Sequence, residues 1–155
     1  MATLLALADL VVRPDEPIAT SDWLEVTQSQ IDAFATVTRD EQWIHTDPVR
    51  AAQSPFGTTI AHGFLTLSLL TQLMTSAFSV AGASMLVNYG LDRVRFTAPV
   101  PAGSRIRARF AVGALTTFRG GVQVTWHVTI ENDRARRPCA LVEWLVRYYV
   151  STPVS

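Results

Sequence analysis

The sequence predicts an α+β fold in which one long buried helix is wrapped by a curled antiparallel sheet. From His62 or Gly63 to about Phe78 the chain has a helical pattern that is apolar on most of its faces, which is typical of a buried helix. Residues 85–150 then form four long strand patterns separated by turns. One long helix held in a curled antiparallel sheet is the hot-dog fold.

The first elements are expected to be short. Residues 1–20 are interpreted as an N-terminal extension, and residues 23–26 as a short strand. Thr27 is predicted to begin a helix, because Gln30 follows three residues later in the pattern of a capping box. This helix is expected to end near Thr38.

Two polar loops and a short helix should connect that helix to the buried one. Residues 39–47 are predicted to form an ordered loop. Asp47 followed by Pro48 is typical of an N-cap and a first helical residue, so a short helix is expected over residues 49–53. Residues 55–63 form the second loop, which leads into the buried helix.

The strand patterns follow in succession along the chain. Residues 85–96 form the first strand, with a break expected at Gly90. Residues 105–112 alternate arginine with apolar side chains and are predicted to be half exposed. After a glycine hairpin turn, residues 122–131 alternate again. Residues 139–150 are apolar on both faces, as expected of a central strand or one that contacts a second subunit.

Composition excludes several classes of function. The length of 155 residues predicts one domain, and the balance of 13 acidic and 13 basic residues leaves no basic field for nucleic acid or a membrane. All the basic residues are arginine, which excludes Schiff-base chemistry by lysine. The only cysteine, Cys139, is expected to lie in the core. Without a signal-peptide pattern or a bilayer-spanning stretch, we expect a cytoplasmic protein.

Residues 36–67 hold the candidate active site, made of two loops and a helix start. Asp40 and His45 form a candidate acid–base pair, and Gly63 stands where backbone N–H groups at a helix start can stabilise an oxyanion. Simpler interpretations stay open: Asp40 as a loop cap, His45 as a packed loop histidine, and His62 as an N-cap or a structural hydrogen-bonding residue.

Other chemistry-bearing residues give weaker signals. The three histidines, His45, His62 and His127, do not have metal-ligand spacing, so no metal site is expected. His127 alternates with threonine and glutamine and is interpreted as a solvated strand residue. Aromatic residues in the last two strands lie at strand spacing, which favours a core or interface position over a ligand-binding one.

The residues of the candidate site resemble the motif of a known family. The segment from Asp40 to His45, DEQWIH, followed by Ala51 and by IAHG at residues 60–63, resembles the hydratase motif of the MaoC-like dehydratases, which include the R-specific enoyl-CoA hydratases. Residues 94–103 are similar to the strand and turn that these proteins carry downstream. The resemblance covers roughly residues 20–150.

Three positions depart from the family pattern. Arg39 replaces a common glycine, and Gln42 and Trp43 stand where asparagine and proline are common. The amide of Gln42 can still orient a ligand or a loop, whereas Trp43 changes the shape beside the site. The form DEQWIH with IAHGF is closer to the nodulation-protein-N-like branch of the family.

The resemblance implies reversible syn addition of water to a trans-2-enoyl-CoA, giving the R-3-hydroxyacyl-CoA. Asp40 and His45 are then catalytic and hold one water between them, and Gly63 is the oxyanion donor. The resemblance implies no cofactor or metal, because coenzyme A enters as part of the substrate. It also suggests further substrate-contacting residues, namely Gln42, His62 and Asn88.

Arg93 and Arg95 fit either contacts to the phosphates of coenzyme A or a solvated strand face. Because a curled sheet leaves open edges, at least a homodimer is expected, and the resemblance puts the site near the dimer interface. Two other functions stay open: a hot-dog acyl-CoA thioesterase, and a non-catalytic protein that binds acyl thioesters. The sequence leaves acyl chain length, carrier and physiological direction undetermined.

Overall fold

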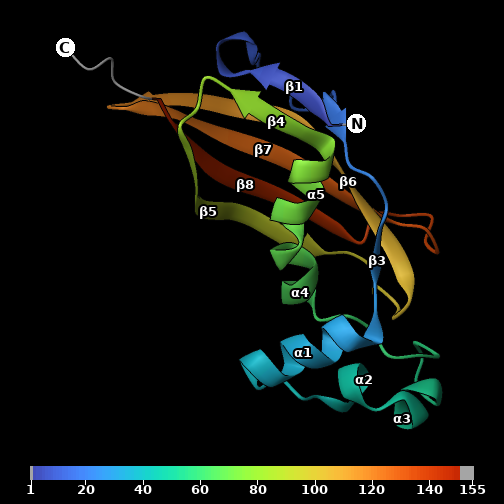
Figure 1. Cartoon of the computed structure of the whole chain (residues 1–155). Helices are drawn as coiled ribbons and strands as arrows, with labels where there is room; N and C mark the ends of the chain where they lie inside the picture. The colour runs from blue at the N-terminus through green and yellow to red at the C-terminus, as the bar shows by residue number, and fades with distance from the viewer. Residues whose placement is uncertain (1, 151–155) are drawn as a thin grey trace.

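A computed structural model describes residues 2–150 as a curved antiparallel sheet crossed by a helical segment, with a small lobe of three helices at one end (Figure 1). The strands are β1 (Thr3–Ala6), β2 (Ala19–Thr20), β3 (Leu24–Val26), β4 (Phe78–Ala81), β5 (Met85–Phe96), β6 (Ser104–Phe118), β7 (Gly121–Asn132) and β8 (Ala140–Tyr149). The helices are η1 (Leu7–Asp9), α1 (Gln28–Thr38), α2 (Trp43–Thr46), α3 (Pro48–Ala52), α4 (Gly63–Ser68) and α5 (Leu70–Ala77).

The main sheet has the order β2-β6-β7-β8-β5, and β3 pairs with another part of β6. The four long strands are present as predicted, and the break expected at Gly90 is confirmed as a register shift between Asn88 and Gly90. The long strands follow one another along the chain as expected, and within the sheet β5 pairs with β8 rather than with β6. Strand β8 therefore has a hydrogen-bonded neighbour at each edge, β7 and β5, as expected of a central strand, and β5 becomes the edge strand.

The inner face of the sheet forms the core against α5. Alternate residues of β6, β7 and β8 point inward, which is why Phe110, Trp126 and Tyr148 are among the largest fully buried side chains. The indole N–H of Trp126 donates to the Tyr148 hydroxyl over 3.0 Å, which satisfies two buried polar groups. Phe78 completes this aromatic cluster by packing on Phe110 and Trp126.

The predicted long helix differs from the expectation in two ways. It consists of α4 and α5, which meet at Leu69, and Phe78 already belongs to β4. It is also not covered all round: Phe64 on α4 is 69% exposed. The reason is geometric, since a single curved sheet covers only the side of the helix that faces it. Among the described residues, no helix combines the length and the hydropathy that crossing a bilayer requires.

The N-terminal extension and the helical lobe follow from local signals. The opening apolar run forms β1, which pairs in parallel with β4. The capping box predicted for Thr27 and Gln30 is present at the start of α1. Residues 39–47, expected to be a loop, contain the short helix α2, and Asp47 caps α3 as predicted, its side chain accepting from the Arg50 N–H.

Candidate active site

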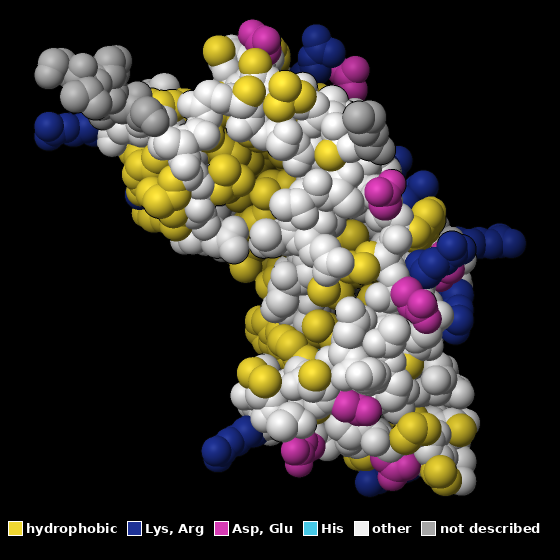
Figure 2. Space-filling view, viewed as in Figure 1, with side chains coloured by type: hydrophobic (Ala, Val, Ile, Leu, Met, Phe, Trp, Pro, Cys, Tyr) yellow, Lys and Arg dark blue, Asp and Glu magenta, His cyan; other side chains and the backbone are white. Residues whose placement is uncertain are grey.

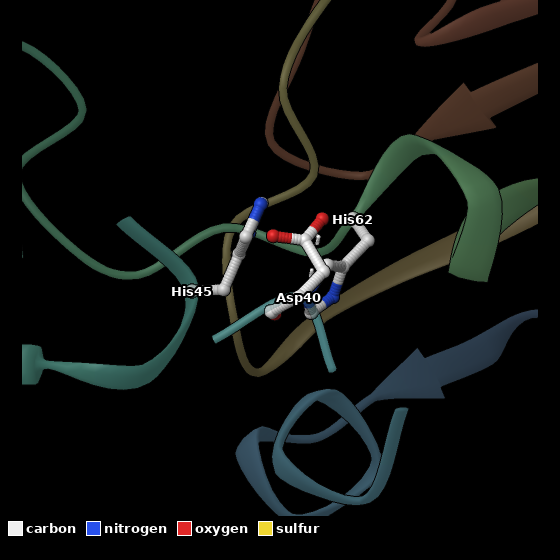
Figure 3. Close-up of side chains that lie close together, drawn as sticks. All are labelled: Asp40, His45 and His62. Carbon is white, nitrogen blue, oxygen red and sulfur yellow. Dashed lines mark hydrogen bonds and ion pairs between the residues drawn. The ribbon is translucent and has the colours of Figure 1, made fainter. Parts of the chain in front are cut away.

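Three side chains from separate segments converge where α4 begins (Figure 3). Asp40 comes from the loop after α1, His45 from α2, and His62 from the residue that precedes α4. One nitrogen or oxygen atom from each of them lies within 4.8 Å of the other two. The two imidazoles are buried, with 7% and 3% exposed, whereas the Asp40 side chain is 56% exposed. The cluster therefore has a buried histidine side and a carboxylate that reaches solvent.

The ring of His45 is held in one tautomer. Its Nδ1 lies 2.6 Å from the backbone carbonyl of Ile60, and because a carbonyl only accepts, Nδ1 must carry the proton. The lone pair is then on Nε2. Burial lowers the pKa of His45, and the nearby His62 lowers it further, while the bond to Ile60 and the Asp40 charge act in the opposite direction. His45 is therefore neutral near pH 7 and has a free basic nitrogen.

His62 holds this arrangement together. Its ring stacks on that of His45, with centroids 3.8 Å apart and planes 25° apart, and Phe34 of α1 packs on it at 5.0 Å. Its Nε2–H donates to the Asp40 backbone carbonyl over 2.9 Å and lies 4.0 Å from the Asp40 carboxylate. His62 occupies the N-cap position of α4, but its side chain makes no capping bond. These contacts make it a partner of both Asp40 and His45.

A cavity of about 340 Å³ opens beside His45 and Gly63. Its wall is mostly apolar and also includes the backbone turn that follows β5. The remaining lining residues are Phe56, Ile60, Ala61, Thr66, Phe96, Thr97, Ala98, Pro99, Val100 and Cys139. Gly63 is the first residue of α4, so its N–H lacks an intrahelical acceptor. A small acyl group in this cavity would meet a base, an apolar wall and a free backbone donor.

The other two residues predicted to contact substrate, Gln42 and Asn88, do not line the cavity beside His45. Gln42 caps α2 and is exposed; its backbone carbonyl accepts from the His45 N–H over 2.9 Å. Asn88 lies on β5 and lines a second cavity of about 280 Å³, together with Phe64 and Trp144. The site cluster therefore does not include Asn88 within one subunit.

Arg93 and Arg95 lie on the outer face of β5, opposite Glu143 and Leu141 of β8, whereas the cavity opens on the inner side. His127 shares that outer face but is half buried, because its ring packs over Gly113. Cys139 is buried as predicted. Burial raises the pKa of its thiol to about 12, so it is not a thiolate nucleophile.

The sequence did not predict the residues that hold the backbone of His45, namely Gln28 and Thr59. The Gln28 side chain contacts the His45 carbonyl and Thr59, and Thr59 directly precedes Ile60. No periodicity or motif points to Gln28, since it looks like an ordinary residue in the first turn of a helix. The only available signal was its place beside the capping box.

The same three site residues are potential metal ligands. First-row metals hold their ligands at about 2.0–2.2 Å, which brings ligand atoms to roughly 3.5 Å of one another. Imidazole lone pairs lie in the ring plane, so two rings stacked 3.8 Å apart do not aim at one point. A water molecule fits better, since two hydrogen bonds of about 2.8 Å span a separation of roughly 4.5 Å. That no metal takes part stays a prediction.

The chain is similar to several known proteins. The family model described as "MaoC like domain" matches residues 9–133. The chain is 47% identical over 149 residues to 3-hydroxyacyl-thioester dehydratase Z of Mycobacterium tuberculosis, covering 96% of this chain and 99% of the relative. It is 46% identical to Nodulation protein N of Rhizobium leguminosarum bv. viciae, over 91% of this chain and 89% of the relative. The solved structure of R-hydratase PhaJ1 from Pseudomonas aeruginosa, 21% identical, covers 96% of this chain and 94% of its own with a TM-score of 0.71. This last likeness shows the hot-dog fold.

Proposed function

The chain belongs to the MaoC-like dehydratase family, and on that premise we propose that it is an R-specific 2-enoyl-CoA hydratase. The names of its relatives place it among the hydro-lyases. The observation that carries the finer proposal is the neutral, tautomer-locked His45 beside Asp40 at the wall of the cavity that Gly63 also lines. A base, a carboxylate and a backbone donor are the groups that hydration of a 2-enoyl thioester needs.

In this proposal one water molecule binds between the Asp40 carboxylate and Nε2 of His45. The water gives a proton to Nε2 as its oxygen forms a bond to C3 of the enoyl group. The negative charge of Asp40 offsets the positive charge that develops on His45. The imidazolium then returns a proton to C2 on the same face, which completes a syn addition. The reverse sequence is dehydration of the 3-hydroxyacyl thioester.

The Gly63 N–H is the proposed donor to the thioester oxygen, where enolate charge builds up before C2 is protonated. A backbone donor suits this position because it is fixed before the reaction begins. Gln42 and His62 act in this proposal through the loop and ring that they hold. Coenzyme A is part of the substrate, and no cofactor is required.

The proposal is tested by adding the protein to crotonyl-CoA and following both the enoyl absorbance and free thiol. We expect the absorbance to fall without release of thiol. Thiol release with an unchanged enoyl group would instead identify a thioesterase, the second candidate function. If neither signal changes with crotonyl-CoA, longer enoyl-CoAs or enoyl groups on acyl carrier protein, the non-catalytic binding function is the one that remains.

The pH dependence of hydration should follow His45. Because His45 must be neutral to accept a proton, and its pKa is lowered by burial, kcat/KM should stay constant down to below the ordinary histidine pKa of about 6.5 and fall only at more acidic pH. The measurement is the pH profile of kcat/KM on crotonyl-CoA. An acid limb with its midpoint clearly above that value would contradict the assignment.

Substituting Gly63→Ala should lower kcat/KM by at least about 10-fold, because alanine keeps the N–H but its methyl group hinders the close approach of the thioester oxygen to it. A Cβ at Gly63 would lie 2.7 Å from the Phe96 ring, so the ring must move within the cavity. The protein should still fold, because Phe96 is partly exposed and can shift. Wild-type kcat/KM in a folded Gly63→Ala protein would contradict this role for Gly63.

We also propose that the protein works as at least a homodimer joined along β5. The edge strand β5 exposes a row of large apolar side chains, and Phe64 of α4 lies beside it in the second cavity. Figure 2 shows hydrophobic side chains gathered in the hollow beside α5 and next to α4. A monomer would leave this surface and an unpaired strand edge in water.

A further inference from the structure

Gln28, the first residue of α1, reaches out of its helix to the segments that carry His45. Its side-chain nitrogen donates to the His45 backbone carbonyl over 2.8 Å and to the Asp32 carboxylate over 2.8 Å. Its side-chain oxygen accepts from the hydroxyl of Thr59, a side chain that is 2% exposed. One side chain thus joins α1, the α2 backbone and the loop before α4.

The orientation of this amide is fixed by chemistry. The His45 carbonyl and the Asp32 carboxylate are both acceptors, so the NH₂ group of Gln28 must face them. The oxygen then faces Thr59, whose hydroxyl has a proton to donate. All three polar contacts are satisfied in this orientation and two would be repulsive in the other.

The two segments that Gln28 joins are the ones that set the tautomer of His45. The Ile60 N–H donates to the Ile44 carbonyl over 3.0 Å, and the His45 ring donates back to the Ile60 carbonyl. Any sliding between α2 and the loop that contains Thr59 would lengthen the ring contact. Gln28 bridges these same segments one residue away on each side, at His45 and Thr59.

We propose that Gln28, together with Thr59, is a positioning residue that keeps the His45 ring in the tautomer and place required for proton transfer. This inference rests on the proposed hydratase function for its kinetic consequence, but its structural consequence is independent of activity. Gln28 touches neither substrate nor reacting atoms; it acts through the His45 backbone and the Ile60 carbonyl.

The test uses Gln28→Met, which keeps the length of the side chain and removes its polar groups, and Thr59→Val, which removes the hydroxyl. On crotonyl-CoA both should lower kcat by about 10- to 100-fold, the cost expected for a small displacement of a catalytic group, with KM little changed. Thr59→Ser keeps the hydroxyl and should retain the wild-type rate. Gln30→Met removes the capping-box partner of Thr27 in the same helical turn and should lower stability while leaving kcat unchanged.

The second readout is the tautomer of His45 in long-range ¹H–¹⁵N spectra, recorded well above the histidine pKa and assigned with His45→Gln. Wild type, Thr59→Ser and Gln30→Met should show only the Nδ1–H form, and Gln28→Met should show a mixture. If Gln28→Met keeps both the single tautomer and the wild-type kcat, the proposal is wrong. If wild type does not hydrate enoyl thioesters, the spectra alone decide: a mixed tautomer supports the positioning role while the hydratase proposal fails.

Discussion

Replacing His45 with glutamine should lower kcat/KM for hydration of crotonyl-CoA by about 10³-fold, within the range that general acid–base groups contribute. Glutamine can occupy a similar place but has no group that takes a proton near neutral pH. Asp40→Asn should cause a loss of similar size, because the amide neither orients the water as an acceptor on both oxygens nor offsets charge on His45. The rates are measured with protein whose fold is verified by circular dichroism.

The two variants should be distinguishable by pH. The charge of Asp40 raises the pKa of His45, so its removal should move the acid limb of the residual Asp40→Asn activity to lower pH. In His45→Gln that limb should disappear. His127→Gln on the outer face of the sheet and Asp15→Asn on the N-terminal segment beside it are matched controls, and both should keep full activity. Folded His45→Gln and Asp40→Asn proteins that hydrate crotonyl-CoA at the wild-type rate would show that these two residues are not the acid–base pair.

Local signals predicted the parts of the fold that depend on neighbouring residues. The capping box at Thr27, the Asp47-Pro48 helix start and the alternation in β6 and β7 are each patterns within a few residues of sequence, and each is present. The position of β5 was not predictable in this way. Which neighbour an edge strand takes depends on pairing between segments far apart in the chain, a property of the whole sheet.

The candidate site likewise has a part that the sequence predicted and a part that depends on distant residues. The motif placed Asp40, His45 and His62 near one another, but not the contacts among them. The bond from His62 to the Asp40 carbonyl spans 22 residues, and just before Asp40 the chain turns at Arg39, which has a left-handed backbone with φ of 59°. Arginine gives no sequence signal for such a turn, whereas the glycine common in the family would have. Asn88 was suggested by resemblance alone, and it lines a different cavity within the subunit.

The second large effect is expected at the subunit interface. Leu91 on β5 pairs with Trp144 and lines the second cavity with Phe64, so in the proposed dimer it would be buried. Leu91→Asp would place an unpaired charge there, which costs several kcal/mol. Since about 1.4 kcal/mol is a factor of ten in affinity, the dimer dissociation constant should rise by at least about 100-fold. In sedimentation at micromolar concentration, the wild type should then run as a dimer and Leu91→Asp as the single 17.0 kDa chain.

Hydratase activity should fall together with dimerisation, because Phe64, the residue after Gly63, is 69% exposed in a single subunit and would be covered in the proposed dimer. Val11→Asp is the matched control: Val11 is 59% exposed on the N-terminal segment, so the same kind of charge there should leave both mass and rate unchanged. A wild-type protein that sediments only as a single chain would refute the interface. A Leu91→Asp monomer with full activity would show instead that the Asp40–His45 site is complete within one subunit.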